Sequence, residues 1–172
     1  MLSFTHFKYC PRCASGNIVA EDENSMRCLA CGYLYFHNAA AAVGGILTYQ
    51  GKILLLQRAM EPMKGKWDAP GGFVGYRESA EEALRRETYE ETSLLIDSLQ
   101  YLGASSNVYI YRDVTYFTSD IFYVGTVASL DKISLSDEIA DYRLIEPGKI
   151  NMDELAFDSL REMVKKYICR FS

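Results

Sequence analysis

Three glutamates on the apolar side of one predicted helix constrain this chain more than any other feature. At about 100° per residue, a helix opened by Glu78 and Ser79 places small or apolar side chains on one side: Ala80, Ala83, Leu84 and Thr88. Glu87, Glu90 and Glu91 stand at i, i+3 and i+4, so their side chains are neighbours. Glu87 and Glu91 lie within the stripe that should face the core, and Glu90 lies at its edge. The single nearby cation, Arg86, falls toward the opposite face of the wheel.

An acidic helix face is ordinarily a solvated surface or a ladder of i,i+4 salt bridges. Here the polar face is already occupied by other residues, and inward carboxylates repel one another and lose hydration. The preceding Pro70-Gly71-Gly72 is a strong turn signal, and glycine allows the backbone to approach a ligand closely. Clustered carboxylate oxygens suit Mg²⁺ or Mn²⁺, which proteins often bind together with substrate phosphates. The pattern therefore favours a metal site for a phosphorylated ligand.

The same residues resemble the Nudix box, G-x5-E-x7-R-E-U-x-E-E-x-G-U, in which U is a bulky apolar residue. Gly72 and Glu78 fill its first positions, and residues 86–94 read RETYEETSL. Every charged position of the motif is present at the correct spacing. Thr88 replaces the usual apolar residue and Ser93 replaces the usual glycine, and neither change removes a carboxylate. The upstream residues 65–72, GKWDAPGG, also look like the usual approach to this box.

The resemblance implies a fold, a reaction and a set of site residues. The fold would be an α/β/α sandwich with a mixed sheet, and the reaction would be attack of water on a phosphorus of a nucleoside diphosphate linked to another group. Catalytic Mg²⁺ or Mn²⁺ would be held by Glu87, Glu90, Glu91 and the carbonyl of Gly72. The general base would be Glu87 or, on a late loop, Glu138. Arg86 and Glu78 would orient the carboxylates rather than react.

Four cysteines near the N-terminus indicate a second metal site. The pairs Cys10/Cys13 and Cys28/Cys31 are both C-x-x-C, separated by 14 residues, which is close to the usual zinc-site spacing. Four thiolates complete a tetrahedral Zn²⁺ shell with no open position, so the predicted role is structural. A disulfide framework fits poorly with a reducing compartment. A redox C-x-x-C would place one pair on a thioredoxin-like βα unit. We expect a zinc ribbon over residues 1–37 and a Nudix domain over 38–172.

The remaining pattern predicts a strand-rich middle followed by a helix. The predicted strands are residues 43–49, 52–58, 94–102, 108–111, 114–117, 121–127 and 140–145. Residues 105–107 are predicted to be a loop, and Arg112-Asp113 is predicted to be a hairpin turn. Leu160, Met163, Val164, Tyr167 and Ile168 follow helical spacing, which predicts an amphipathic C-terminal helix on the sheet. Cys169 is expected to be a small buried hydrophobic side chain.

Composition limits the kinds of partner. The 172 residues carry a net charge of −5, which disfavours nonspecific nucleic-acid binding. The first residues lack a signal-peptide core, and no apolar stretch is long enough for a membrane span. A soluble cytoplasmic protein is expected. A homodimer agrees with the resemblance, although no residue requires one.

The expected substrate is a dinucleotide such as NADH or FAD, or an ADP-ribose-like compound. This follows from the resemblance to NADH and FAD/ADP-ribose pyrophosphatases that carry a zinc ribbon before the Nudix domain. The S-Q-P-W stretch of the NADH enzymes and the proline typical of ADP-ribose enzymes are absent. Two alternatives stay open: a non-catalytic Nudix-domain nucleotide sensor or regulator, and a zinc-ribbon nucleic-acid module. Few basic residues occur in the ribbon, which disfavours the second.

Overall fold

The N-terminal unit contains a small antiparallel sheet and the four cysteines. The computed structural model describes residues 7–112 and 114–171. Contacts divide the chain into two compact units between Ala39 and Ala40. In the first unit, β1 (Ile18–Ala20) pairs with β2 (Ser25–Cys28), and β2 pairs with β3 (Leu34–Phe36). Such a short sheet buries little apolar surface, so a unit of this size normally needs a metal or another crosslink.

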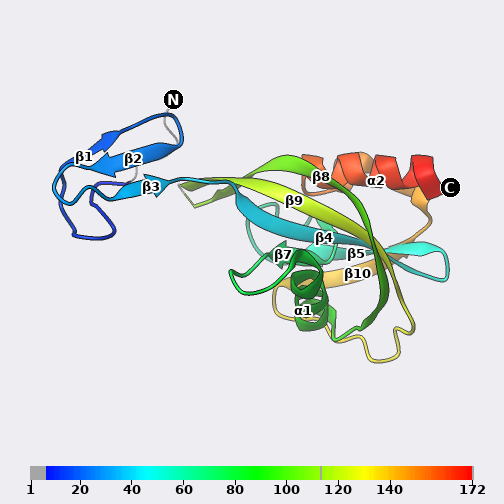
Figure 1. Cartoon of the computed structure of the whole chain (residues 1–172). Helices are drawn as coiled ribbons and strands as arrows, with labels where there is room; N and C mark the ends of the chain where they lie inside the picture. The colour runs from blue at the N-terminus through cyan, green and yellow to red at the C-terminus, as the bar shows by residue number, and fades with distance from the viewer. Residues whose placement is uncertain (1–6, 113, 172) are drawn as a thin grey trace. The chain divides into compact units, whose positions relative to one another are not determined.

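The second unit contains a seven-stranded mixed sheet (Figure 1). Five strands form the order β10-β5-β4-β9-β8, in which β4 and β9 are parallel and the other neighbours are antiparallel. Two short strands join it, because β6 pairs with β5 and β7 pairs with β4. The bounds are β4 (Ala40–Tyr49), β5 (Lys52–Arg58), β6 (Trp67–Asp68), β7 (Gly71–Phe73), β8 (Ile96–Tyr111), β9 (Val114–Val127) and β10 (Ile139–Ile145). The predicted mixed sheet is confirmed.

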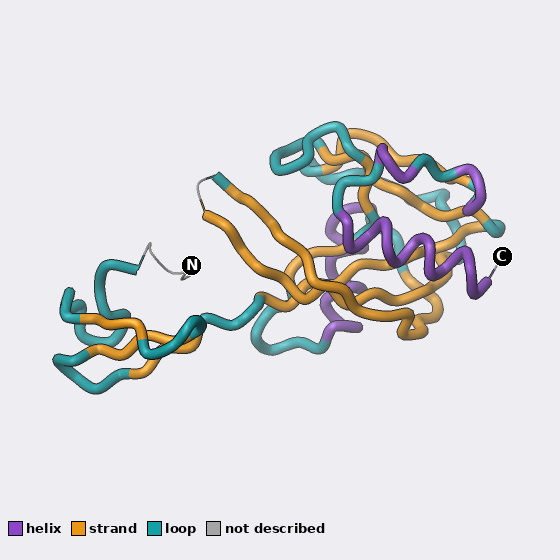
Figure 2. Tube along the Cα trace, turned by 90° about the horizontal axis from the view of Figure 1, so that it is seen from above, coloured by secondary structure: helices purple, strands orange, loops and turns teal. Residues whose placement is uncertain are grey.

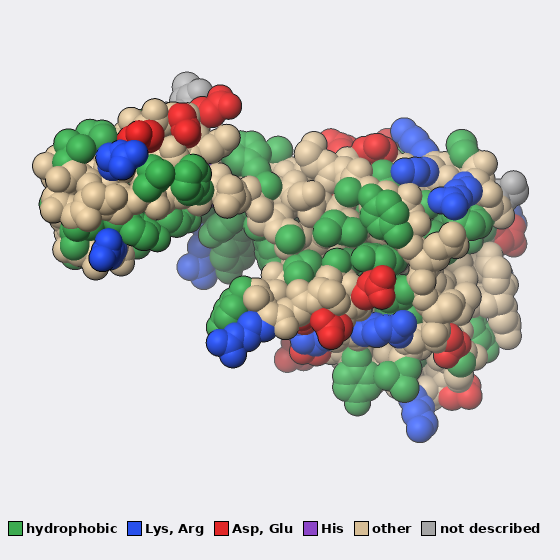
Figure 3. Space-filling model, viewed as in Figure 1, with side chains coloured by type: hydrophobic (Ala, Val, Ile, Leu, Met, Phe, Trp, Pro, Cys, Tyr) green, Lys and Arg blue, Asp and Glu red, His purple; other side chains and the backbone are tan. Residues whose placement is uncertain are grey.

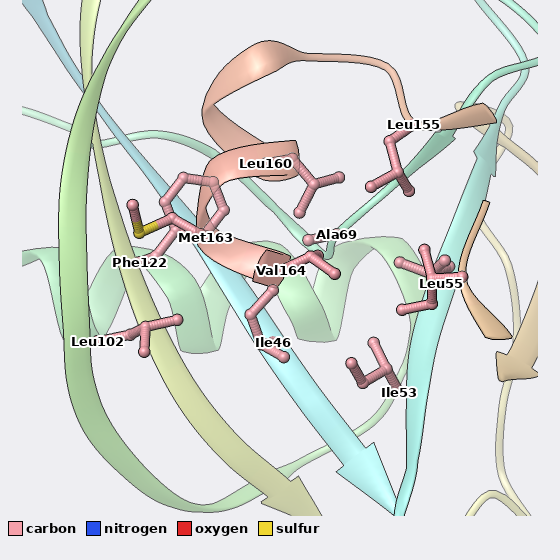
Figure 4. Close-up of a cluster of buried hydrophobic side chains, with 11 residues drawn as sticks. Ile46, Ile53, Leu55, Ala69, Leu102, Phe122, Leu155, Leu160, Met163 and Val164 are labelled. Atoms are coloured by element: carbon pink, nitrogen blue, oxygen red, sulfur yellow. The ribbon is translucent and has the colours of Figure 1, made fainter. Parts of the chain in front are cut away.

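One helix packs against each face of this sheet, as expected for an α/β/α sandwich. Helix α1 (Ala80–Thr92) contributes Ala83 and Leu84 to one buried cluster. Helix α2 (Asp158–Phe171) contributes the apolar stripe predicted from its spacing to the cluster on the other face (Figure 4). Two 3-10 turns, η1 (Pro147–Lys149) and η2 (Met152–Glu154), lead into α2. No helix among the described residues is long and apolar enough to cross a membrane.

Local sequence explains the two elements that carry most of the core. The apolar run of β5 is buried on both faces, and residues 53–56 are at most 1% exposed. Such a run is typical of a central strand. Helix α1 begins at a capping box, in which Ser79 accepts from the Glu82 backbone and the Glu82 side chain accepts from Ser79. It ends at Ser93, which adopts the left-handed conformation (φ 60°) at the position where the Nudix box usually has glycine.

Three predictions about local structure are wrong. Residues 105–107 are not a loop, because β8 runs without a break from Ile96 to Tyr111 and pairs with β9 along its length. Figure 2 shows this two-stranded ladder continuing beyond the rest of the sheet. Gly71–Phe73 forms a short strand, although Pro70-Gly71-Gly72 was predicted to be a turn. Cys169 is exposed rather than buried. Arg112 stands at the predicted hairpin turn, and Asp113 lies outside the described residues.

Candidate metal and nucleotide site

The glycine turn before α1 contacts the inward glutamates of that helix. Strand β7 pairs with β4, placing Gly72 opposite Val43 and Gly71 opposite Gly44. The Gly71 N–H donates to Glu91 Oε2 at 3.1 Å. A Cβ at Gly72 would lie 2.5 Å from the Glu87 Cδ, so the absence of a side chain is what admits the Glu87 carboxylate. The turn and the helix thus place two carboxylates against one stretch of backbone.

Arg86 bridges three of the glutamates and does not point away from them as predicted. Its guanidinium donates to both oxygens of Glu78, at 3.0 and 2.7 Å. It also donates to Glu87 Oε1 at 2.8 Å and Glu90 Oε2 at 2.9 Å. The long Arg side chain reaches back across the helix, which a wheel of Cα positions cannot show. The hydrogen bonds from Arg86 and then from the Gly75 N–H lower the pKa of Glu78 to about 2.

The two inward glutamates are electrostatically under-compensated. Desolvation raises the pKa of Glu91 well above its ordinary value, and the charges of Asp68, Glu87 and Glu138 act in the same direction. Desolvation also raises the pKa of Glu87, although Arg86 opposes this shift. A cation bound beside Glu87 and Glu91 would therefore offset both the desolvation of their carboxylates and the repulsion between them.

A cavity of about 350 Å³ opens beside these carboxylates. Of the predicted site residues, Gly72, Glu87, Glu91 and Glu138 line it together. Glu90 does not line it, and its side chain is 58% exposed and bonded to Arg86. Glu78 and Arg86 stand behind Glu87. The structure thus brings together the carboxylates of the helix and the late-loop glutamate, although Glu91 and Glu138 lie 47 residues apart in the sequence.

Several residues of the cavity were missed from the sequence. Arg58 donates to Asp68 at 2.9 Å, and its guanidinium lies 5.3 Å from the centre of the Phe157 ring. Burial raises the pKa of Asp68 despite this ion pair. Other walls come from strands β8 and β9 and from the start of α2: Asn107, Tyr109, Thr118, Asp120 and Ser159. One sequence signal could have revealed the missed strand residues. Polar side chains stand at alternate positions of strands whose other positions cover a core.

The four cysteines of the first unit form one cluster. Their sulfur atoms all lie within 4.8 Å of one another. Cys10 and Cys31 sulfurs are 3.8 Å apart, and those of Cys13 and Cys28 are 3.7 Å apart. All four are free thiols, with no disulfide among them. Four sulfurs converging from two knuckles are compatible with a tetrahedral zinc site.

The visible charge distribution offers no broad basic surface. On the face seen in Figure 3, basic and acidic side chains are interspersed with apolar ones, within the described part of the chain. A basic stripe is what nonspecific nucleic-acid binding requires.

The fold and the box define a class of protein, and comparison with known proteins identifies it. The family model described as NUDIX domain matches residues 37–167. The chain belongs to the Nudix family. The fold also matches the crystal structure of a NUDIX hydrolase from Nitrosomonas europaea, with a TM-score of 0.76 and 24% identity, over 96% of this chain and 92% of that one.

Two kinds of curated relative are similar in sequence. An ADP-ribose pyrophosphatase from Methanocaldococcus jannaschii is 34% identical over 135 residues, which cover 78% of this chain and 76% of that protein. A NAD-capped RNA hydrolase NudC from Chromobacterium violaceum is 32% identical over 103 residues, which cover 60% of this chain. The chain spans only 38% of the length of that NudC.

Proposed function

We propose that this protein is a metal-dependent pyrophosphohydrolase that cleaves a nucleoside diphosphate linked to a second group, such as a dinucleotide or an ADP-ribose-like compound. The observation that carries the proposal is the pair of partly buried, under-compensated carboxylates, Glu87 and Glu91, lining a cavity beside the Gly71-Gly72 turn. Both the ADP-ribose pyrophosphatase and the NudC relative are named for diphosphate compounds, which supports the same class of substrate.

The donor set fits a hard divalent cation such as Mg²⁺ or Mn²⁺. Glu87, Glu90 and Glu91 supply carboxylate oxygens and Gly72 supplies a carbonyl, as the resemblance implies. Glu90 would have to turn from its present hydrogen bond with Arg86 to take part. When bound, the cation neutralises the diphosphate and lowers the pKa of water. Glu78 then holds Arg86, and Arg86 holds Glu87 in place.

Glu138 is the better placed of the two candidate general bases. Glu138 lines the cavity, and within the described residues its carboxylate makes no hydrogen bond or ion pair. Glu87, by contrast, already accepts from Arg86. In the proposed reaction, Glu138 accepts a proton from water while the water oxygen bonds to phosphorus. The bond from phosphorus to the bridging oxygen breaks, and two phosphorylated products leave.

The test is a hydrolysis panel with purified protein and Mg²⁺. FAD, NADH, ADP-ribose and dinucleoside polyphosphates are each incubated, and nucleoside monophosphate release is measured by chromatography. Release from at least one compound, and its loss in Glu91→Gln, is expected. Tight binding by calorimetry with no turnover of any compound would instead support the nucleotide sensor or regulator.

We also propose that residues 1–37 form a structural zinc ribbon held by Cys10, Cys13, Cys28 and Cys31. Cys28→Ser is expected to lose zinc and unfold this ribbon while leaving kcat/KM within about twofold, because a closed tetrahedral site does no chemistry. Zinc content and amide hydrogen exchange over residues 7–37 measure the first effect. The exposed Cys169→Ser is the matched control. A parallel fall in hydrolysis and ribbon order would contradict this division of roles.

A further inference from the structure

One buried carboxylate in the cavity has no part in the proposed metal site. Asp120 of β9 is only 8% exposed and lines the same cavity as Glu87 and Glu91. It accepts from Thr118 Oγ1 through Oδ1 and from Ser159 Oγ through Oδ2, each at 2.6 Å. Among the residues that the structure describes, no cation pairs with it. A buried carboxylate held so firmly and left without a counter-charge requires an explanation.

The two hydroxyl donors leave the carboxylate able only to accept. Each carboxylate oxygen has capacity for a further hydrogen bond after one hydroxyl has donated to it. Thr118 and Ser159 donate their hydroxyl protons to Asp120, so neither hydroxyl proton is available to a ligand. This corner of the cavity therefore presents two adjacent acceptors to a ligand.

Aromatic rings line the cavity together with these acceptors. The Tyr109 ring lies 5.9 Å from that of Phe157 and 5.6 Å from that of Phe73, measured between centroids. Phe73 is 43% exposed, so an aromatic surface remains open to solvent at the cavity. Such a surface suits stacking of a flat nucleobase or packing of a sugar face.

We propose that Asp120 is a specificity-determining residue that binds two neighbouring hydrogen-bond donors on the nucleoside part of the substrate, with the aromatic rings packing beside it. The inference rests on the proposed function for the identity of the site. Two sources carry this donor pair: the cis-diol of a ribose, and the N1–H and N2–H edge of guanine. Adenine presents one donor and one acceptor on the corresponding edge, so its acceptor would oppose the carboxylate.

Asp120→Asn tests the inference because it replaces one acceptor with a donor at almost constant shape. The ligands are methylene-bridged analogues of diguanosine diphosphate and diadenosine diphosphate and the 2′-deoxy form of each. Their dissociation constants are measured by calorimetry with Mg²⁺, and kcat/KM is measured on the cleavable forms. Asp158→Asn is the matched control, because Asp158 is exposed, pairs with Arg161 and does not line the cavity.

The two possible sources of the donor pair, a guanine edge and a ribose diol, predict different changes in ligand selectivity. For a guanine edge, wild type prefers diguanosine over diadenosine by at least about tenfold, and Asp120→Asn removes or inverts that ratio. For a ribose diol, wild type prefers the ribose form over the 2′-deoxy form, and the variant abolishes this preference without altering the base ratio. Asp158→Asn changes neither ratio.

A purely structural role, in which Asp120 only fixes the start of α2 through Ser159, gives a different result. All four affinities would then change by the same factor or not at all, and the inference would be overturned. If Asp120→Asn does not fold, Ser159→Ala is measured instead, and unaltered selectivity would overturn the inference equally. Selective binding without any cleavage would overturn the proposed hydrolase and leave the role of Asp120 standing.

Discussion

Glu91→Gln is expected to lower kcat by about 10²–10³-fold and, at the same time, to stabilise the metal-free protein. The loss of activity follows because one cation ligand is replaced by a neutral group, and charge neutralisation of the diphosphate is worth several kcal/mol. The gain in stability follows because the Glu91 carboxylate is desolvated and lies near the charges of Asp68, Glu87 and Glu138. Glutamine keeps an oxygen for the Gly71 N–H.

The sign of the stability effect depends on pH in a defined way. A carboxyl whose pKa is raised by folding holds its proton more tightly in the folded state, so metal-free stability falls as pH rises above the ordinary glutamate value. Glu91→Gln should therefore match wild type in acid and exceed it near neutral pH. Each kcal/mol gained corresponds to about 2–4 °C in melting temperature for a chain of this size.

Thermal melts with and without Mg²⁺, together with the hydrolysis assay, check both effects. Mg²⁺ is expected to raise the melting temperature of wild type more than that of Glu91→Gln. Glu81→Gln is the matched control, because Glu81 is an exposed carboxylate in the first turn of the same helix. If metal-free Glu91→Gln is less stable than metal-free wild type at neutral pH, the protein already stabilises the Glu91 carboxylate without a cation. Full activity in Glu91→Gln would show that Glu91 is not a ligand of the catalytic metal.

The part of the site that could be predicted from sequence is the part encoded by local spacing. Glu87, Glu90 and Glu91 are neighbours on any helix, and the motif fixed the helix and the glycine turn before it. The inward direction of Glu87 and Glu91 followed from the wheel, and burial of Ala83 and Leu84 confirms the face that packs on the sheet. The apolar stripe of α2 was readable for the same reason.

The rest depends on residues that only tertiary structure brings together. Asp120 and Ser159 are 39 residues apart, and no pattern in the sequence states that their side chains meet. The predicted loop at residues 105–107 failed because its small polar residues resemble a turn. Pairing with β9 overrides that local preference. Arg86 was misplaced because a helical wheel records where a side chain leaves the backbone rather than where a long chain ends.

Gly72→Ala is expected to lower activity by about 10²-fold while leaving the fold nearly as stable as wild type. An added Cβ would lie 2.5 Å from Glu87 Cδ and 2.6 Å from its Oε1, so the carboxylate must move away. The end of a glutamate side chain can move at little cost to stability. A displacement of about 1 Å at a catalytic group can nonetheless cost about 10²-fold in rate.

The neighbouring Gly71→Ala separates this effect from backbone strain. There the Cβ would lie 2.1 Å from the Val43 carbonyl oxygen, and Gly71 has φ of 152°, so the β7–β4 pairing itself must yield. Gly71→Ala should therefore lower the melting temperature strongly, whereas Gly72→Ala should lower activity with little change in melting temperature. If both variants lose stability equally, glycine at position 72 is required for pairing within the sheet rather than for the position of the Glu87 carboxylate. If Gly72→Ala keeps full activity, the position of Glu87 beside the turn is not required for hydrolysis.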